Sequence, residues 1–173
     1  MALYSSTRDS KVEIYRVNPI ILCLLAIFAL ALQSYLPIPL PSTRYLDFPL
    51  LVVVYYGLTR RNAISGLLVG SIVGIAQDAL TRGPLGMIGI VKTVIGYVTT
   101  FLSVRFDVDS RGFRFTISFV SYWLSYLLLV LMSLLLVHSP IPVEIGVRLL
   151  ASIVNSVIGV LLFSLLDRFR RQT

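Results

Sequence analysis

The feature that most constrains this chain is a series of long apolar segments separated by short breaks, which contain most of the charged residues. The segments cover residues 19–36, 46–59, 62–79, 85–104, 113–137 and 143–166. A helix needs about 20 residues to cross the hydrocarbon core of a bilayer, and all of the segments except the second, at 46–59, approach or exceed that length. Lipid offers no hydrogen-bond partners, so every backbone polar group in the bilayer must be satisfied within the protein. No segment shows the alternation of a barrel strand, so each is predicted to be a helix.

The composition indicates that lipid is the main solvent of this chain. Of its 173 residues, 57% are hydrophobic and 13% are charged, whereas soluble domains contain about 25% charged residues. So few charges could not cover a soluble particle of this size. The sequence predicts an all-α integral membrane protein, a six-transmembrane-helix bundle with one membrane domain at residues 19–167. Residues 1–18 are expected to form an N-terminal head and residues 168–173 a C-terminal stub.

Lys and Arg residues sort between the two faces that six spans would create. One face would have eleven of them and the other only Arg44 and Arg82, which places both termini in the cytoplasm by the positive-inside rule. This sorting requires the second segment to cross, although it has only 14 residues and Pro49 near its start. The basic residues do not gather in one patch, so no nucleic-acid partner is expected. The eleven are Arg8, Lys11, Arg16, Arg60, Arg61, Arg105, Arg111, Arg114, Arg168, Arg170 and Arg171.

The first segment also has features of a signal peptide, because a basic stretch precedes it and residues 29–31 read Ala-Leu-Ala. However, the apolar run continues to Leu36, and cleavage would leave five spans and disturb the charge sorting. We therefore expect an uncleaved first helix.

Glycines mark predicted contacts between helices. Gly66, Gly70 and Gly74 recur at every fourth position of the third segment, and Gly89 and Gly96 lie in the fourth. A stripe without side chains lets a neighbouring helix approach closely. The pattern predicts helix packing, with a substrate cavity as the alternative.

Charged and polar residues inside the apolar segments are expensive to bury and usually face a partner or a watery cavity. Lys92 and Arg148 lie within the fourth and sixth segments, and Asp78 lies at the end of the third. We expect Asp78 to neutralise Lys92 or Arg148, as a structural clasp, as an interface for another protein's helix or as part of a ligand pocket. The predicted intramembrane polar cluster consists of Gln77, Asp78, Lys92, Arg148 and Asn155, and Asp47 and Glu144 lie at similar depth.

No catalytic or metal-binding motif is recognisable in the sequence. There is no Ser–His–Asp set, no His/Cys cluster and no phosphate-binding loop after a strand. His138 is the only histidine and falls in a predicted loop. We therefore expect a protein without catalytic activity, cofactor or metal.

One stretch of the chain resembles the central signature of the rod shape-determining protein MreD family. The resemblance is carried by Gln77-Asp78, by Pro84-Leu85-Gly86 and by Gly96-Tyr97 at their spacings, with Lys92 between the last two. Residues 46–58 resemble the same family, as do the chain length and the expected six spans. Lys92 is shared by only part of the family, and the last two segments match mainly in hydropathy.

The resemblance implies a non-enzymatic membrane scaffold of the bacterial cell-elongation machinery, located in the cytoplasmic (inner) membrane. Its partners would be an MreC-like single-span protein and, through that complex, MreB, RodA and a penicillin-binding transpeptidase. The break at residues 105–114, with Asp107 and Asp109, would either meet cytoplasmic partners and anionic membrane lipids or simply fix the topology.

The resemblance to MreD also raises an alternative, because the fold of that family is similar to that of the substrate-binding subunits of energy-coupling-factor vitamin transporters. In such a subunit, the cluster around Asp78, Lys92 and Arg148 would form the floor of a vitamin site. Those subunits usually have small residues spaced by four on the first helix, whereas here Ala26 is followed by Leu30.

Overall fold

Each of the apolar segments forms a helix in the computed structural model, which describes residues 19–60, 62–81, 84–106, 108, 110–137 and 144–169. The observed ends lie within two residues of the predicted ones when the π-helical turn after α5 is included. No strand occurs among the described residues. The elements are α1 (Pro19–Tyr35), the 3-10 helix η1 (Pro41–Tyr45), α2 (Phe48–Thr59), α3 (Ala63–Thr81), α4 (Met87–Ser103), α5 (Arg111–Met132), the π-helix η2 (Ser133–Val137), α6 (Ile145–Leu166) and the 3-10 helix η3 (Asp167–Phe169).

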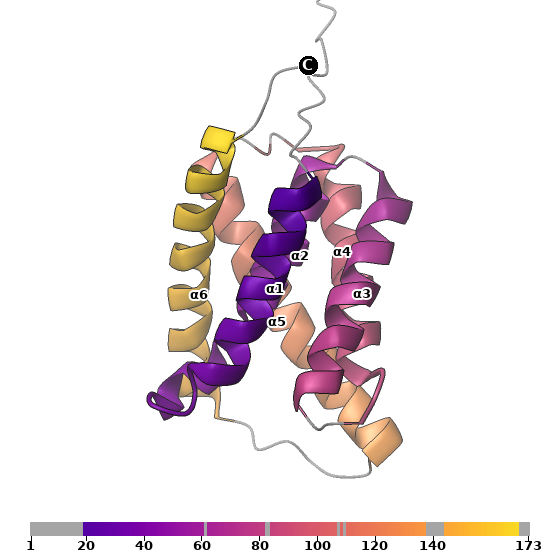
Figure 1. Cartoon of the computed structure of the whole chain (residues 1–173), viewed down its shortest axis with the longest axis vertical. Coiled ribbons are helices and arrows are strands. Elements are labelled where there is room, and N and C mark those ends of the chain that lie inside the picture. Colours follow the sequence, from indigo (N-terminus) through magenta and orange to yellow (C-terminus); the bar gives the residue numbers. More distant parts are fainter. Residues whose placement is uncertain are drawn as a thin grey trace, which may run out of the picture.

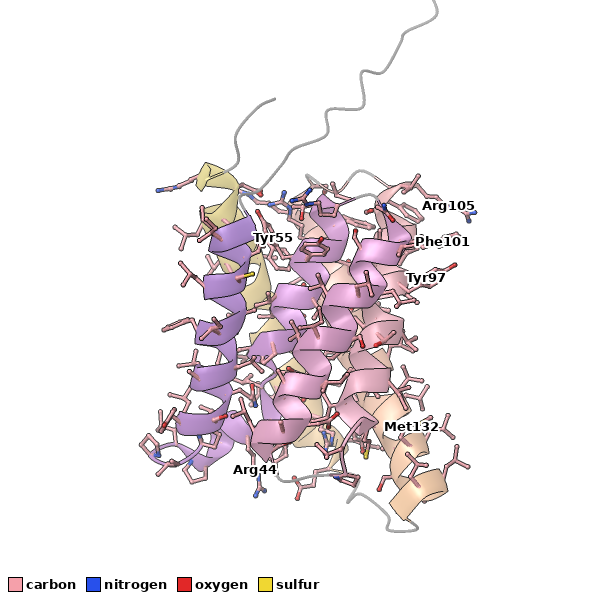
Figure 2. All side chains as sticks on the ribbon, turned by 45° about the vertical axis from the view of Figure 1, so that its right-hand side comes forward. Arg44, Tyr55, Tyr97, Phe101, Arg105 and Met132 are labelled. Carbon is pink, nitrogen blue, oxygen red and sulfur yellow. The ribbon has the colours of Figure 1, made fainter. Side chains whose placement is uncertain are left out.

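The helices run alternately up and down, so the described chain begins and ends at the same end of the bundle (Figure 1). The turn between α1 and α2, which contains η1, lies at the opposite end. Arg44 and Arg105 mark these two ends in Figure 2, and we name them the η1 end and the Arg105 end. α3 and α4 form one side of the bundle, and α6 lies on the other side, packed against α5.

Three helices are long and apolar enough to cross a membrane: α3, α5 with its continuation to Leu136, and α6. α1 and α4 are apolar but shorter. Many large apolar side chains, such as Ile27, Ile72 and Leu161, are exposed on the outside of the bundle. The all-helical architecture and these apolar surfaces fit a membrane protein.

The shortest of the described α-helices, α2, occupies the centre of the bundle. It contacts each of the other five α-helices, and ten of its 12 residues are buried. A helix that is apolar on all sides is stable only where other apolar surfaces surround it. The neighbouring helices cover α2 along its sides, which suits a segment that is apolar all round.

Glycines bring the backbones of α3 and α4 into direct contact. A Cβ atom on Gly70 would lie 2.1 Å from the carbonyl oxygen of Lys92, and one on Gly96 would lie 2.2 Å from that of Gly66. No side chain fits at such distances, so the approach of the two helices requires glycine at these positions. The remaining glycines of the predicted stripe, Gly74 and Gly89, also face each other across this contact.

Candidate functional site: a polar junction at the η1 end

The start of α2 is built around the carboxylate of Asp47. This residue is the N-cap of α2, and its Oδ1 accepts a hydrogen bond of 3.0 Å from the backbone N–H of Leu50. The ammonium group of Lys92, from α4, lies 2.6 Å from Oδ1 and 2.9 Å from Oδ2. The Lys92 side chain is 0% exposed and that of Asp47 is 18% exposed. A cation buried inside the bundle is thus neutralised by the residue that begins the central helix.

Gln33 of α1 holds the same segment from another side. Its Nε2 donates a hydrogen bond of 3.0 Å to the carbonyl oxygen of Leu46, and its Oε1 accepts one of 3.1 Å from the N–H of Phe48. The N–H groups in the first turn of a helix have no partner within the helix. Gln33 supplies such a partner and fixes the direction in which α2 starts.

α5 and α6 complete the contacts to this segment. The Tyr122 hydroxyl, on α5, donates a hydrogen bond of 2.7 Å to the carbonyl oxygen of Tyr45. Asn155 Oδ1, on α6, accepts a hydrogen bond of 3.3 Å from the N–H of Asp47. Residues 45–48 are therefore tied to four other helices, and we name this arrangement the η1–α2 junction.

The predicted pairing of Asp78 with Lys92 or Arg148 is wrong. The Asp78 carboxylate accepts hydrogen bonds from the backbone N–H groups of Gly86, Ile88 and Gly89, at 3.0, 3.0 and 2.9 Å. These groups lie at the start of α4, where the helix dipole and the unpaired N–H groups attract a negative charge. Asp78 is thus a cap that α3 provides for α4, and Lys92 takes its counter-ion from Asp47 instead.

The residues of the family motif form the connection between α3 and α4 and the outer face of α4. Gly86 has a φ of +96°, a left-handed conformation that favours glycine, and it is the N-cap of α4. Pro84 and Leu85 precede it and are exposed. Tyr97 is 46% exposed and stacks on Phe101, with ring centroids 6.4 Å apart (Figure 2).

A cavity of about 150 Å³ opens beside the η1–α2 junction. Arg148 lines it, with its guanidinium carbon 3.9 Å from the ring centroid of Tyr126 and 5.8 Å from that of Tyr45. Gln77 and Asp47 also line it. The cavity therefore brings together Arg148 and Gln77, two members of the predicted polar cluster. Asn155 is buried and contacts Asp47, whereas Asp78 is used at the start of α4.

A chain of polar contacts closes the junction on the outside. Arg44 Nη2 donates a hydrogen bond of 2.6 Å to the Tyr45 hydroxyl, which in turn donates to the carboxylate of Glu144 before α6. The hydrogen bond to Tyr45 raises the pKa of Arg44 above its ordinary value. These contacts link η1 to the start of α6.

At the Arg105 end, one basic residue of the predicted inner loop is used inside the protein. Arg114 is buried, forms an ion pair of 2.5 Å with Asp167 and donates from Nε to the carbonyl oxygen of Val108 at 2.8 Å. Arg105 is exposed and its guanidinium lies 4.2 Å from the ring centroid of Phe101. Arg114 therefore has a structural role in this loop, whereas Arg105 and Arg111 are exposed.

Sequence reasoning missed Gln33, Tyr45 and Tyr126 as residues of this site. Gln33 could have been found, since it is a polar residue near the end of an otherwise apolar segment. Tyrosines are too frequent in membrane helices to stand out. Several predictions concern residues outside the described ranges: the head (1–18), the stub beyond 169, Arg61, Arg82, Asp107, Asp109 and His138.

Comparisons with known proteins do not place the chain in a family. No protein-family model, no curated protein and no solved structure matches it. Within the part of the chain that the structure describes, no three metal-binding side chains come together. The geometry of the η1–α2 junction and the motif residues therefore provide the basis for a functional proposal.

Proposed function

We propose that this chain is a non-enzymatic scaffold of the bacterial cell-elongation machinery, with six membrane-spanning helices and both termini in the cytoplasm. In this proposal it binds an MreC-like single-span protein and helps couple MreB to lateral peptidoglycan synthesis. The motif resemblance to the MreD family supplies the biological context, and the helix arrangement supports the proposed topology. Helices that alternate in direction bring both described ends to one end of the bundle, which agrees with the sorting of Lys and Arg.

The observation that carries the proposal is the use of the motif residues around the α3–α4 connection. Asp78 and Gly86 stabilise the connection internally, whereas Leu85 and Tyr97 from the same motif are exposed, at 78% and 46%. Polar motif residues that hold helices together, beside apolar ones that face outward, suit a rigid surface for another protein's helix. We propose that the exposed side of α4, where the motif residue Tyr97 lies, forms part of the surface that binds the partner's helix.

The transporter alternative is favoured by one observation, the polar cavity beside the η1–α2 junction. Its volume of about 150 Å³ is small, because sites for drug-sized ligands usually enclose about 300–1,000 Å³. A vitamin would require the cavity to enlarge. The scaffold is therefore the better-supported function of the two.

Affinity purification of the tagged chain from its native membrane in mild detergent would test the proposal. Proteins and small molecules are identified together by mass spectrometry. Recovery of an MreC-like protein with wall-synthesis enzymes, and without a stoichiometric small molecule, is the expected result. Paired ATPase subunits or a bound vitamin would instead support the transporter subunit.

A matched pair of variants locates the surface. Tyr97→Ala shortens an exposed side chain on α4, and Leu161→Ala shortens one on α6, at the other side of the bundle. We expect Tyr97→Ala to reduce recovery of the MreC-like partner at equal expression, and Leu161→Ala to leave it unchanged. Equal recovery with both variants would remove the exposed side of α4 from the proposal.

A further inference from the structure

Unused hydrogen-bonding groups gather around the cavity beside the η1–α2 junction. Three residues that line it have a buried polar atom without a hydrogen-bond partner: Gln77 Oε1, the Tyr126 hydroxyl and Arg148 Nε. Gln77 is itself only 6% exposed. Buried polar groups in folded proteins are almost always hydrogen-bonded. Three unsatisfied groups on one cavity therefore indicate that something polar occupies it.

The charges around the cavity favour an anion. Asp47 is the one carboxylate among the described lining residues, and Lys92 already neutralises it at 2.6 Å. No described carboxylate forms an ion pair with Arg148, whose positive charge therefore remains available. Arg44, also a lining residue, adds a second cation, and Glu144 reaches this region through the Tyr45 hydroxyl.

The unsatisfied atoms also define what else the occupant must offer. Arg148 Nε is a donor, and a guanidinium presents a planar fork that matches the oxygens of a phosphate or carboxylate. Gln77 Oε1 is an acceptor and requires a donor such as a hydroxyl group. The volume of about 150 Å³ equals roughly five water molecules at about 30 Å³ each. The occupant is therefore small, anionic and hydroxylated.

We propose that this cavity binds a glycerol phosphate group, with the phosphate at Arg148 and Tyr126 and a glycerol hydroxyl at Gln77. The group could come from the headgroup of an anionic phospholipid or from free glycerol 3-phosphate. Arg44, one of the lining residues, lies at the η1 end of the bundle (Figure 2), and the ends of the helices of a membrane protein meet the headgroup region. This binding does not depend on the proposed scaffold, because the cavity belongs to the isolated chain.

The test uses the purified full-length chain in nanodiscs of phosphatidylcholine. Binding of glycerol 3-phosphate is titrated calorimetrically, and native mass spectrometry compares retention of phosphatidylglycerol with that of phosphatidylcholine. We expect saturable one-to-one binding of at least one of the two glycerol phosphate probes. Binding of the free solute alone identifies a soluble ligand, and retention of phosphatidylglycerol alone identifies a lipid headgroup.

Three variants make the result specific. Arg148→Gln should weaken binding at least tenfold, equivalent to about 1.4 kcal/mol. Tyr126→Phe keeps the ring beneath Arg148 but removes the unsatisfied hydroxyl. It should weaken binding several-fold while leaving the thermal stability of the ligand-free protein unchanged or higher, so a folding defect cannot explain the loss. Arg105→Gln, at the opposite end, is the matched control and should bind as the wild type does.

Two outcomes would overturn the proposal. One is the absence of saturable binding of either probe, which would leave ordered water as the occupant of the cavity. The other is a loss of phosphatidylglycerol in Arg105→Gln that equals the loss in Arg148→Gln, because that result would indicate non-specific attraction of anionic lipid to surface arginines.

Discussion

The ion pair between Asp47 and Lys92 permits a quantitative test of how the bundle is held together. Asp47→Asn keeps an Oδ1 atom that can accept the hydrogen bond from the N–H of Leu50, but it removes the charge. The ammonium group of Lys92, 0% exposed, then has no counter-ion at hydrogen-bonding distance. Removing one partner of a buried ion pair costs about 3–5 kcal/mol, and we expect a loss of unfolding free energy in that range.

Removal of Lys92 should lower the unfolding free energy by less than removal of the charge on Asp47. In the wild-type structure the Asp47 side chain is 18% exposed and accepts a hydrogen bond from the N–H of Leu50. In Lys92→Met this carboxylate therefore keeps one partner and some contact with solvent. Loss of one charged hydrogen-bond partner in such a setting costs about 1.5–3 kcal/mol. The double variant has neither charge and keeps similar side-chain volumes, so its loss should be close to zero, about 1 kcal/mol or less. The coupling energy is then at least about 3 kcal/mol.

Unfolding by titration with sodium dodecyl sulfate in mixed micelles would measure these values. Trp123, the only tryptophan, packs against Tyr126 on α5 and provides the fluorescence signal. If the loss in the double variant equalled the sum of the single losses within about 0.5 kcal/mol, the two side chains would not be coupled. The claim that Asp47 neutralises Lys92 would then be refuted.

Two further changes test the α3–α4 contact. Asp78→Ala removes the acceptor for three backbone N–H groups and should lower the unfolding free energy by about 1–3 kcal/mol. Hydrogen exchange at the start of α4 should become faster, and unchanged exchange there would contradict the capping role. Gly70→Ala places a Cβ atom 2.1 Å from the carbonyl oxygen of Lys92, so the helices must separate at a cost of about 1–3 kcal/mol. Gly146→Ala, with nothing within 4 Å of its added Cβ, should be neutral, and equal melting temperatures for the two alanine variants would rule out the predicted clash.

The positions of the helices could be predicted because one physical requirement dominates the sequence. Every backbone group in an apolar solvent must be paired within the chain, so each apolar run becomes a helix and each run of polar residues ends one. The α1 and α6 segments therefore begin or end within two residues of the expected positions. The central place of α2 was not predicted, although a short segment that is apolar on all sides suits burial by its neighbours.

The partners of the polar residues could not be predicted in the same way. Sequence position gives the depth of a residue along a helix but not the direction in which that helix faces its neighbours. Asp47, Asp78 and Glu144 were all predicted at similar depth, so depth alone could not choose the counter-ion of Lys92. The choice is made by the glycine contact between α3 and α4, which brings Asp78 over the start of α4.

The same contact explains why the cavity is polar and still has unused groups. Because Asp78 is committed to backbone N–H groups and Asp47 to Lys92, no described carboxylate neutralises Arg148. An arginine in an apolar bundle is expensive unless it gains a partner, and here it lies against Tyr126 beside a cavity. The nearby carboxylates of Asp47 and Asp78 are thus already paired with groups that hold the helices together. The positive charge of Arg148 is therefore the one that we expect an anionic ligand to bind.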